Sequence, residues 1–360
     1  MTMIGFLKKS ALGLAGLLVL SALLGWGYVH SLDLDAEPRA NPKATASDLT
    51  FVRQGITEAR GRILAVVSST PQIGDSGKRT GYELTELSRA YWVFVANGYA
   101  VDIASPQGGE PPMVLDEDLV DADHAFLNDP QAQRKSRSTL RLADVDPTAY
   151  DGVYFVGGKG AMFDFPGNAD IQRIVAEILP RGAVGAVCHG PAALIGLRLA
   201  DGTPVLAGRK VTGFSNDEEL FLIENARALF PFLLQEQLQR EAGDYREGPM
   251  YLDNTQVDGR LVTGQNPWST WSVAESMIRV LGHAPVPRQA TTEEISIDLL
   301  ATYRARGLSA ALARKASGPP SSKQLLLMHA VVAGMQYKLG EAWELQRLAR
   351  HPTIGSTGSD

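Results

Sequence analysis

Short apolar runs alternate with segments of helical spacing from about residue 60 to residue 283, and this alternation constrains the fold of the chain most strongly. The apolar runs are rich in residues that favour strands: 62–69, 99–105, 150–158, 183–187, 210–214 and 259–264. The segments between them carry apolar residues at helical spacing, most clearly 85–98, 168–182, 191–202 and 269–282. Parallel strands need such crossover connections. We therefore predict an α/β fold, with a flavodoxin-like, doubly wound and mostly parallel sheet and helices on both faces.

The α/β domain is predicted to cover residues 60–283. Within it, residues 106–149 are polar and irregular and predict an insertion or lid over the edge of the sheet. Before it, residues 32–59 carry Pro38 and Pro42 among polar neighbours and favour a linker.

Residues 284–360 differ from the rest and predict a C-terminal helical extension. Thr291 with Glu294, and Ser321 with Gln324, match the capping box that opens a helix. The apolar residues that follow occupy more than one helix face. We therefore expect this extension to be buried against the core domain, a second subunit or a membrane.

Residues 1–31 contain an uncharged apolar segment, SALGLAGLLVLSALLGWGYV, at positions 10–29. As a helix it would be about 30 Å long, the thickness of the hydrocarbon core of a bilayer. Lys8 and Lys9 precede it and acidic residues follow it. This predicts a transmembrane helix that anchors the chain and places the rest on the periplasmic or extracellular side. The alternative is a cleaved secretory signal and a secreted protein, but the apolar region of a signal is usually shorter.

The charge balance and the single cysteine limit the possible functions. With 34 basic and 40 acidic residues, the chain lacks the basic excess of a nucleic-acid-binding protein. Cys188 is the only cysteine, so the chain forms no internal disulfide. It is either a small buried apolar residue or a reactive thiol.

The surroundings of Cys188 favour a reactive thiol. The apolar run AVGAV leads straight into Cys188 and His189, and Gly190 and Pro191 begin a helical segment directly afterwards. A strand that turns sharply into a helix in this way is a nucleophile elbow, here with A-V-C-H-G in place of G-x-S-x-G. The turn would present the thiol at the carboxyl end of the sheet, and the helix N-terminus is expected to lower the thiol pKa below about 8.5. The alternative is a packed, inert cysteine.

Two further stretches place polar groups at the same edge of the predicted sheet. Gly157 and Gly158 end an apolar run, so their backbone N–H groups could line an oxyanion pocket, although a tight turn also explains them. Glu86 lies on the first helix after the first strand, facing that edge. For Glu86 alone, the alternative is a solvated surface carboxylate.

Five motifs, taken in order, resemble the ThiJ/PfpI superfamily, whose fold is shared with the class I glutamine amidotransferases: TGYELTEL with YAVDIASPQGGEPP, GGKGAMFDFP, AVCHGPAAL, KVTGFSNDEE and GRLVTGQNPWS. Within the superfamily, the chain is most similar to the branch of glutathione-independent glyoxalases and stress-type holding chaperones. The resemblance covers about residues 60–283. It does not extend to the N-terminal segment or to the helical extension.

The resemblance assigns roles to individual residues. It implies that Cys188 is the nucleophile and His189 its adjacent base. It implies that the carboxyl group of Glu86 hydrogen-bonds the sulfur and that Glu219 orients the histidine. Glu218 is the alternative for this last role, since a slip of one residue is easy there.

The glycine-rich stretch matches the family's substrate pocket. By resemblance, Gly158 and the backbone of His189 are the oxyanion donors, with Gly157 beside them. Lys159 stands where the family usually has histidine. A lysine there changes the charge and the proton-transfer options near the pocket, which leaves the choice of substrate open.

The chemistry implied by the resemblance is a glyoxalase reaction without glutathione, metal or organic cofactor. The thiolate of Cys188 would attack the aldehyde of a small 2-oxoaldehyde such as methylglyoxal, and hydrolysis of a later thioester would release a 2-hydroxy acid. The alternatives are a holding chaperone and a cysteine hydrolase or deglycase of the same superfamily. A homodimer is the expected assembly, because dimers are common among such proteins.

Other classes and ligands fit the sequence less well. A glutamine amidotransferase needs a His-x-Glu segment, and none of the six histidines is followed by x-Glu. A chaperone would need an exposed apolar patch, which Trp268 and Trp271 or the helical extension could supply. His124 lies in a polar stretch and is expected to be solvated, so no metal site is predicted.

Overall fold

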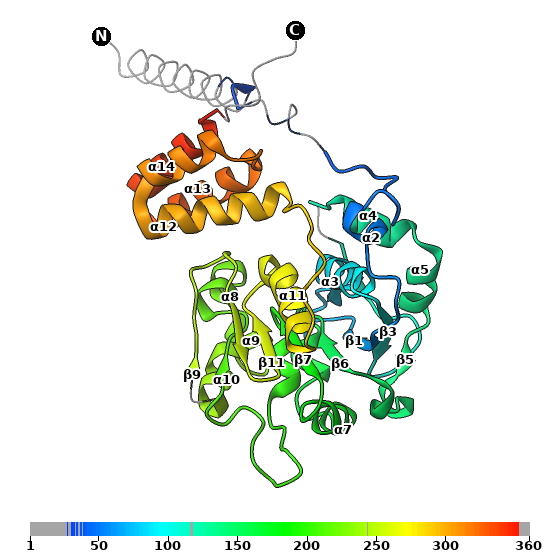
Figure 1. Cartoon of the computed structure of the whole chain (residues 1–360). Coiled ribbons are helices and arrows are strands. Elements are labelled where there is room, and N and C mark those ends of the chain that lie inside the picture. The colour runs from blue at the N-terminus through cyan, green and yellow to red at the C-terminus, as the bar shows by residue number, and fades with distance from the viewer. Residues whose placement is uncertain are drawn as a thin grey trace, which may run out of the picture. The chain divides into compact units, whose positions relative to one another are not determined.

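The computed structural model describes residues 27, 30–32, 34, 37, 39–115, 118–242 and 244–352. The chain divides into two compact units. One is the α/β unit, Ala40–Gln289, and the other combines Met1–Arg39 with Ala290–Asp360. Figure 1 shows the sheet of the first unit and the bundle of helices in the second.

A seven-stranded sheet forms the centre of the α/β unit, in the order β10-β11-β7-β6-β1-β3-β5. Every neighbouring pair is parallel except β10 and β11, which are antiparallel. The predicted α/β sheet is therefore confirmed for this unit. The strands are β1 (Gly61–Val66), β3 (Tyr99–Ser105), β5 (Leu140–Arg141), β6 (Gly152–Phe155), β7 (Ala183–Val187), β10 (Thr255–Asp258) and β11 (Leu261–Gly264).

Helices cover both faces of this sheet (Figure 1). Helices α3 (Leu84–Ala96) and α11 (Thr270–Val280) pack together on one face, and α7 (Ala169–Ile178) lies on the other. The buried residues of α7 are Ile171, Ile174, Val175 and Ile178, a spacing that turns one apolar stripe to the sheet. The shorter elements of the unit are α2 (Thr50–Arg53), β2 (Tyr82–Glu83), β4 (Met113–Val114), α4 (Asp121–Asn128), α5 (Pro130–Arg137), α6 (Ala161–Asp164), β8 (Lys210–Val211), α8 (Asn216–Leu222), α9 (Ala226–Leu229), α10 (Leu234–Ala242) and β9 (Asp244–Tyr245).

Two predicted elements differ from the structure. The expected strand at 210–214 is only β8, which pairs with β9 in a separate small sheet. The expected helix at 191–202 is only a 3₁₀-helix, η4 (Gly190–Leu194). It ends because Ile195 adopts an extended backbone conformation, with a φ of −69° and a ψ of 130°.

Residues 106–149 are more regular than their composition suggests. They include α4, α5 and the edge strand β5 of the main sheet. Asp129 caps α5 by accepting hydrogen bonds from Gln131 N and Ala132 N, and Pro130 occupies the first helical position. Local polar residues thus form caps here, and the segment extends the sheet.

A buried ion pair joins α4 to α3. Arg89 Nη2 lies 3.1 Å from Asp123 Oδ2, with 5% and 0% of the two side chains exposed. Ser88 Oγ and Val120 N also donate to the Asp123 carboxylate. A buried carboxylate with this many donors is well compensated for its loss of water.

The helical unit contains α12 (Thr292–Ser317), α13 (Lys323–Met335) and α14 (Leu339–Arg350). The predicted capping box of Thr291 and Glu294 is confirmed, because Glu294 N donates to Thr291 Oγ1 and Thr291 N to Glu294. The second predicted box, Ser321 with Gln324, is wrong, since α13 is capped by Ser322 alone, which accepts a hydrogen bond from Leu325 N. Gly307, with a φ of 79°, breaks α12 into two halves.

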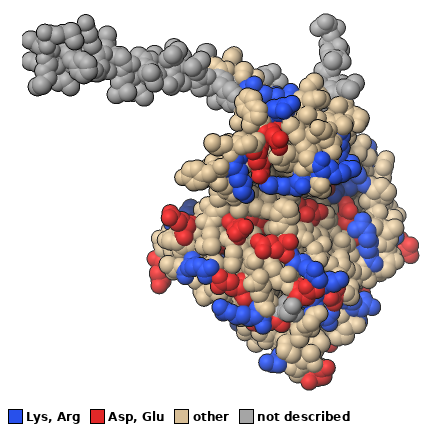
Figure 2. Space-filling view, turned by 90° about the vertical axis from the view of Figure 1, so that its left-hand side faces the viewer, with Lys and Arg blue, Asp and Glu red and all other residues tan. Residues whose placement is uncertain are grey.

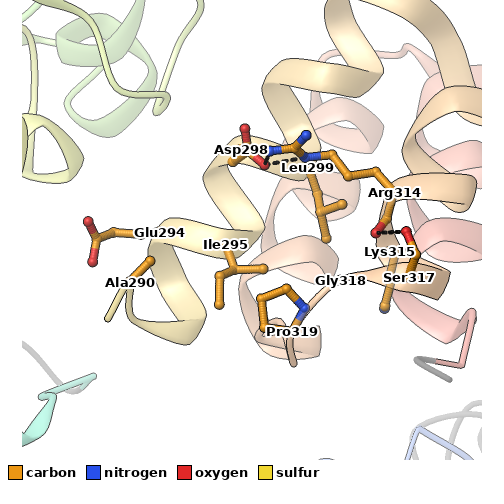
Figure 3. Close-up of a pocket in the computed structure, with 10 residues that line it drawn as sticks. All are labelled: Ala290, Glu294, Ile295, Asp298, Leu299, Arg314, Lys315, Ser317, Gly318 and Pro319. Atoms are coloured by element: carbon orange, nitrogen blue, oxygen red, sulfur yellow. Dashed lines mark hydrogen bonds and ion pairs between the residues drawn. The ribbon is translucent and has the colours of Figure 1, made fainter. Parts of the chain in front are cut away.

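A cavity of about 450 Å³ lies within this helical unit, between the two halves of α12 (Figure 3). Its lining combines apolar Ile295, Leu299 and Pro319 with the ion pair of Asp298 and Arg314. None of the predicted site residues lines it.

The structure contradicts the predicted transmembrane helix. Among the residues that the structure describes, no helix is both long and apolar enough to cross a membrane. Nearly all of the predicted span, residues 10–29, lies outside the described residues. The predictions of membrane anchoring and of a periplasmic or extracellular location rested on this helix and are corrected with it.

Opposite charges are mixed on the surface. On the face shown in Figure 2, Lys and Arg side chains lie among Asp and Glu side chains, and neither sign forms a continuous field. Several opposite charges of the described residues are paired, as in Arg62 with Asp102 and Arg246 with Asp244.

We predict that Asp123→Asn destabilises the protein by about 3–5 kcal/mol, because it removes the negative charge that pairs with the buried Arg89. Adding Arg89→Met to this variant should recover part of the loss, since the double variant removes both charges of the pair. Urea unfolding followed by circular dichroism measures both effects. Fully additive losses from the two substitutions would contradict this account of the ion pair.

Candidate active site

Cys188 occupies a sharp turn at the end of a central strand. Strand β7 ends at Val187, and η4 begins at Gly190. Cys188 adopts a φ of 58°, a conformation that non-glycine residues rarely take. Two hydrogen bonds hold the turn, from Cys188 N to Gly264 O at 3.0 Å and from Phe214 N to Cys188 O at 2.9 Å. This is the geometry of a nucleophile elbow.

The residue after His189 must be glycine. A Cβ atom at Gly190 would lie 2.3 Å from the carbonyl oxygen of Phe155 in the neighbouring strand β6. Real Cβ atoms do not approach backbone oxygens so closely, so the turn from β7 into η4 depends on the missing side chain.

His189 links the thiol to a carboxylate. Its Nδ1 atom lies 3.3 Å from Cys188 Sγ, and its Nε2 atom lies 2.6 Å from Glu219 Oε2. Both His189 and Glu219 are 2% exposed. The ring of Phe214 packs on the imidazole at a centroid distance of 4.5 Å. Cys188, His189 and Glu219 therefore form a continuous buried chain.

Glu218 faces away from this chain. Its carboxylate accepts hydrogen bonds from Ser215, from Tyr251 N at 2.8 Å and from Asn266 Nδ2 at 2.8 Å. It thus caps α8 and ties this helix to the loops around it. The geometry pairs Glu219, and not the alternative Glu218, with His189.

Glu86 is fully buried rather than solvated. It lies in the first turn of α3 and accepts a hydrogen bond from Gly157 N at 2.7 Å. It lies beside Cys188 at Gly157, and its charge acts on the Cys188 thiol. Tyr154 donates from its hydroxyl to the Glu86 carbonyl oxygen at 3.0 Å and fixes the helix start.

The two adjacent glycines have different surroundings. A Cβ atom at Gly157 would lie 2.6 Å from Glu86 Oε2 and 2.8 Å from Cys188 Cβ, so glycine permits this close approach. The N–H of Gly157 is bound to Glu86, which differs from the expected oxyanion role. By contrast, the N–H groups of Gly158 and His189 donate to no acceptor within the described part of the chain.

The pKa of the Cys188 thiol is raised well above its ordinary value, which is the opposite of the expected lowering. Burial is the main cause, and the nearby charges of Glu86 and Glu83 add to it. The charge of Lys159 acts in the other direction. The helix after the thiol is only a short 3₁₀-helix, so its dipole is a weak opposing effect.

Glu83 was not singled out from the sequence. It is half-buried, and its charge acts on the thiol. The available signal was its position three residues before Glu86 in GYELTEL, which places both carboxyl groups on one side of the start of α3. Over the described residues, no group of three or more His, Cys, Asp or Glu residues could hold a metal ion.

Comparison with known proteins places this site in a family. The model of the DJ-1/PfpI family matches residues 78–279. Glyoxalase 3 of Candida albicans is 30% identical over 226 residues, which cover 60% of this chain and 96% of that protein. The glutathione-independent glyoxalase hsp3101 of Schizosaccharomyces pombe is 33% identical over 237 residues, which cover 62% of this chain and 96% of that protein.

Solved structures agree with this assignment. Rapid Encystment Protein 24 kDa of Francisella tularensis is 33% identical, with a TM-score of 0.58 over 61% of this chain and 99% of that one. Glyoxalase III of Candida albicans is 29% identical, with a TM-score of 0.56 over 61% of this chain and 97% of that one. A family match over more than half of the chain, on a fold that carries its thiol at the predicted elbow, shows that this chain belongs to the DJ-1/PfpI family.

Proposed function

We propose that this protein is a glutathione-independent glyoxalase that converts small 2-oxoaldehydes such as methylglyoxal to 2-hydroxy acids. One observation carries the proposal: the Cys188 thiol lies 3.3 Å from Nδ1 of His189, which is bound in turn to Glu219, and the buried Glu86 carboxylate lies beside Cys188. This arrangement provides a nucleophile with a proton acceptor on either side. The names of the relatives, several of them glutathione-independent glyoxalases, support the same activity.

In the first step, the sulfur of Cys188 forms a bond to the aldehyde carbon and the thiol loses its proton to Glu86 or His189. Because the raised pKa keeps the resting thiol protonated, this transfer must accompany the attack. The aldehyde oxygen takes up negative charge and then a proton. The free N–H groups of Gly158 and His189 are the donors placed to stabilise that oxygen.

In the second step, a base removes the hydrogen from the former aldehyde carbon and an enediol forms. A proton is then returned to the neighbouring carbon, which gives the thioester of a 2-hydroxy acid. Water finally cleaves the thioester, so the net reaction adds one water molecule and regenerates the thiol. Glu86 suits the carbon-to-carbon transfer, because it lies beside Cys188 and its Oε2 atom is held by Gly157 N.

We predict that Cys188→Ala abolishes lactate formation from methylglyoxal and that Glu86→Gln lowers kcat by about 10²–10⁴-fold, the range for loss of a general acid–base. The assay measures lactate in the absence of glutathione. The matched control is Glu177→Gln, at an exposed glutamate of α7 that pairs with Arg181. This variant should retain full activity.

Folding of each variant is checked by circular dichroism. Lactate formation that persists in folded Cys188→Ala would refute the proposed function, as would a folded wild-type protein without turnover.

We predict that iodoacetamide alkylates Cys188 slowly at neutral pH and that the rate keeps rising from about pH 7 to 10, because the fraction of thiolate rises until the pH passes the raised pKa. Glu86→Gln should raise the rate at pH 7 several-fold, since removal of a neighbouring negative charge lowers the thiol pKa. Mass spectrometry of the single cysteine measures the rate. A plateau below pH 8 in the wild-type protein would contradict the raised pKa.

A holding chaperone is a second candidate, favoured by an exposed apolar cluster in the helical unit. The cluster lies on α13, on α14 and on the turn that joins them, and consists of Val331, Met335, Tyr337, Leu339 and Trp343, which are 61–90% exposed. Trp271, in contrast, is buried, and Trp268 packs against Tyr251. Trp268 and Trp271 therefore supply no such surface.

We predict that the double variant Met335→Ser, Trp343→Ser suppresses thermal aggregation of citrate synthase less well than the wild-type protein, because it removes apolar contact area from the cluster. Light scattering measures aggregation. Lactate formation in the same variant should be unchanged. Equal suppression by both proteins would exclude this cluster as the holding surface.

The alternative of a cysteine hydrolase or deglycase uses the same thiol and stays a prediction. The expected homodimer likewise stays a prediction.

A further inference from the structure

Lys159 is the one residue with a side chain in a loop of glycines. Neighbouring atoms pack closely against the backbone of this loop. The loop joins β6 to α6 and reads Gly157–Gly158–Lys159–Gly160. A Cβ atom at Gly158, where φ is 98°, would lie 2.4 Å from Gly81 O, and a Cβ atom at Gly160 would lie 2.6 Å from Ser68 Oγ. The Cα atom of Lys159 is therefore held in place by the close packing of the residues on both sides of it.

The ammonium group of Lys159 has no anionic partner in the described residues. Its side chain is half-buried, yet it forms no ion pair or side-chain hydrogen bond with any other residue that the structure describes. Many other described basic residues are paired, for instance Arg173 with Asp170 and Arg209 with Asp258. A half-buried cation without a counter-charge attracts an anion from solution.

Lys159 also lies within electrostatic reach of the reacting atom. Its charge acts on the Cys188 sulfur, as do those of Glu83 and Glu86. Lys159 directly follows Gly158, whose N–H group is one of the two donors placed to bind the substrate oxygen. An anion bound by this ammonium would therefore belong to the same ligand as the aldehyde that the thiol attacks.

We propose that Lys159 is a specificity-determining residue that binds the anionic group of the substrate, so that the preferred substrates are 2-oxoaldehydes carrying a carboxylate or phosphate. This inference rests on the proposed glyoxalase function and names its substrate class. The anionic group takes no part in the reaction. The aldehyde and ketone carbons are hydrated and rearranged to a 2-hydroxy acid, and the second acidic group leaves unchanged in the product.

The acidic residues near the thiol limit where that group can lie. The carboxyl groups of Glu83 and Glu86 oppose a negative charge directly beside the sulfur. The preferred substrate thus separates its anionic group from its aldehyde carbon by several bonds. The compound 4,5-dioxopentanoate meets this requirement, and its methyl ester is a neutral substrate of closely similar shape.

The test compares kcat/KM for 4,5-dioxopentanoate and its methyl ester in the wild-type protein, Lys159→Met and Lys159→Arg. We expect the wild-type protein to prefer the anion by about 10- to 100-fold, as for a hydrogen bond between charged groups, with the preference expressed mainly in KM. Lys159→Met should bring the ratio near one, and Lys159→Arg should retain most of it. Lys210→Met, on an exposed lysine of β8, is the control and should keep the wild-type ratio.

A loss of activity through the thiol alone would lower kcat/KM for both substrates by the same factor and leave their ratio unchanged in Lys159→Met. That result would overturn the inference and leave the glyoxalase function intact. A folded wild-type protein that converts methylglyoxal but neither of these compounds would overturn this inference alone, and one that converts none of the three would refute the proposed function as well.

Discussion

The site depends on how closely the ends of β6 and β7 approach each other. The register pairs Phe155 with Ala186, so Gly157 comes opposite Cys188 two residues later. Because no side chain stands at Gly157, the Glu86 carboxylate binds the Gly157 N–H and lies close beside Cys188. Filling that space with a single methyl group would separate the nucleophile from its carboxyl partner. The parallel register of β6 and β7 thus determines which groups meet at the site as well as how the strands of the sheet are paired.

Burial makes the thiol selective. A cysteine whose pKa is raised reacts slowly with the electrophiles and oxidants that seek thiolates. The same groups that raise the pKa can accept the proton when a carbonyl carbon is placed against the sulfur. Reactivity is then conditional on a ligand that fits. His189, held between the sulfur and Glu219 and packed on Phe214, lacks the freedom to leave this arrangement.

Sequence patterns predicted the parts of this site that depend on local geometry. The run AVGAV before Cys188 and the glycine after His189 indicate the elbow, whereas only the family resemblance narrowed the histidine partner to Glu218 or Glu219. The final choice needed the tertiary structure, because Tyr251 and Asn266 bind Glu218 from distant segments, in addition to the local capping bond of Ser215. The thiol pKa was predicted in the wrong direction for a similar reason. Burial by the surrounding fold outweighs the dipole of a one-turn helix. Likewise, the expected helix after the elbow is cut short because the backbone turns to an extended conformation at Ile195, and the expected strand at 210–214 leaves the main sheet to pair with a distant segment.

The backbone at Cys188 has a consequence for how such a chain can change. A left-handed conformation at a non-glycine residue costs about 1–3 kcal/mol, and glycine would adopt it freely. Replacement of Cys188 by glycine would therefore stabilise the fold, but it would also remove the thiol. Selection for thermal stability alone would favour glycine at position 188. Cysteine at this φ angle lowers the stability of the fold, and only the reactivity of its thiol offsets that loss.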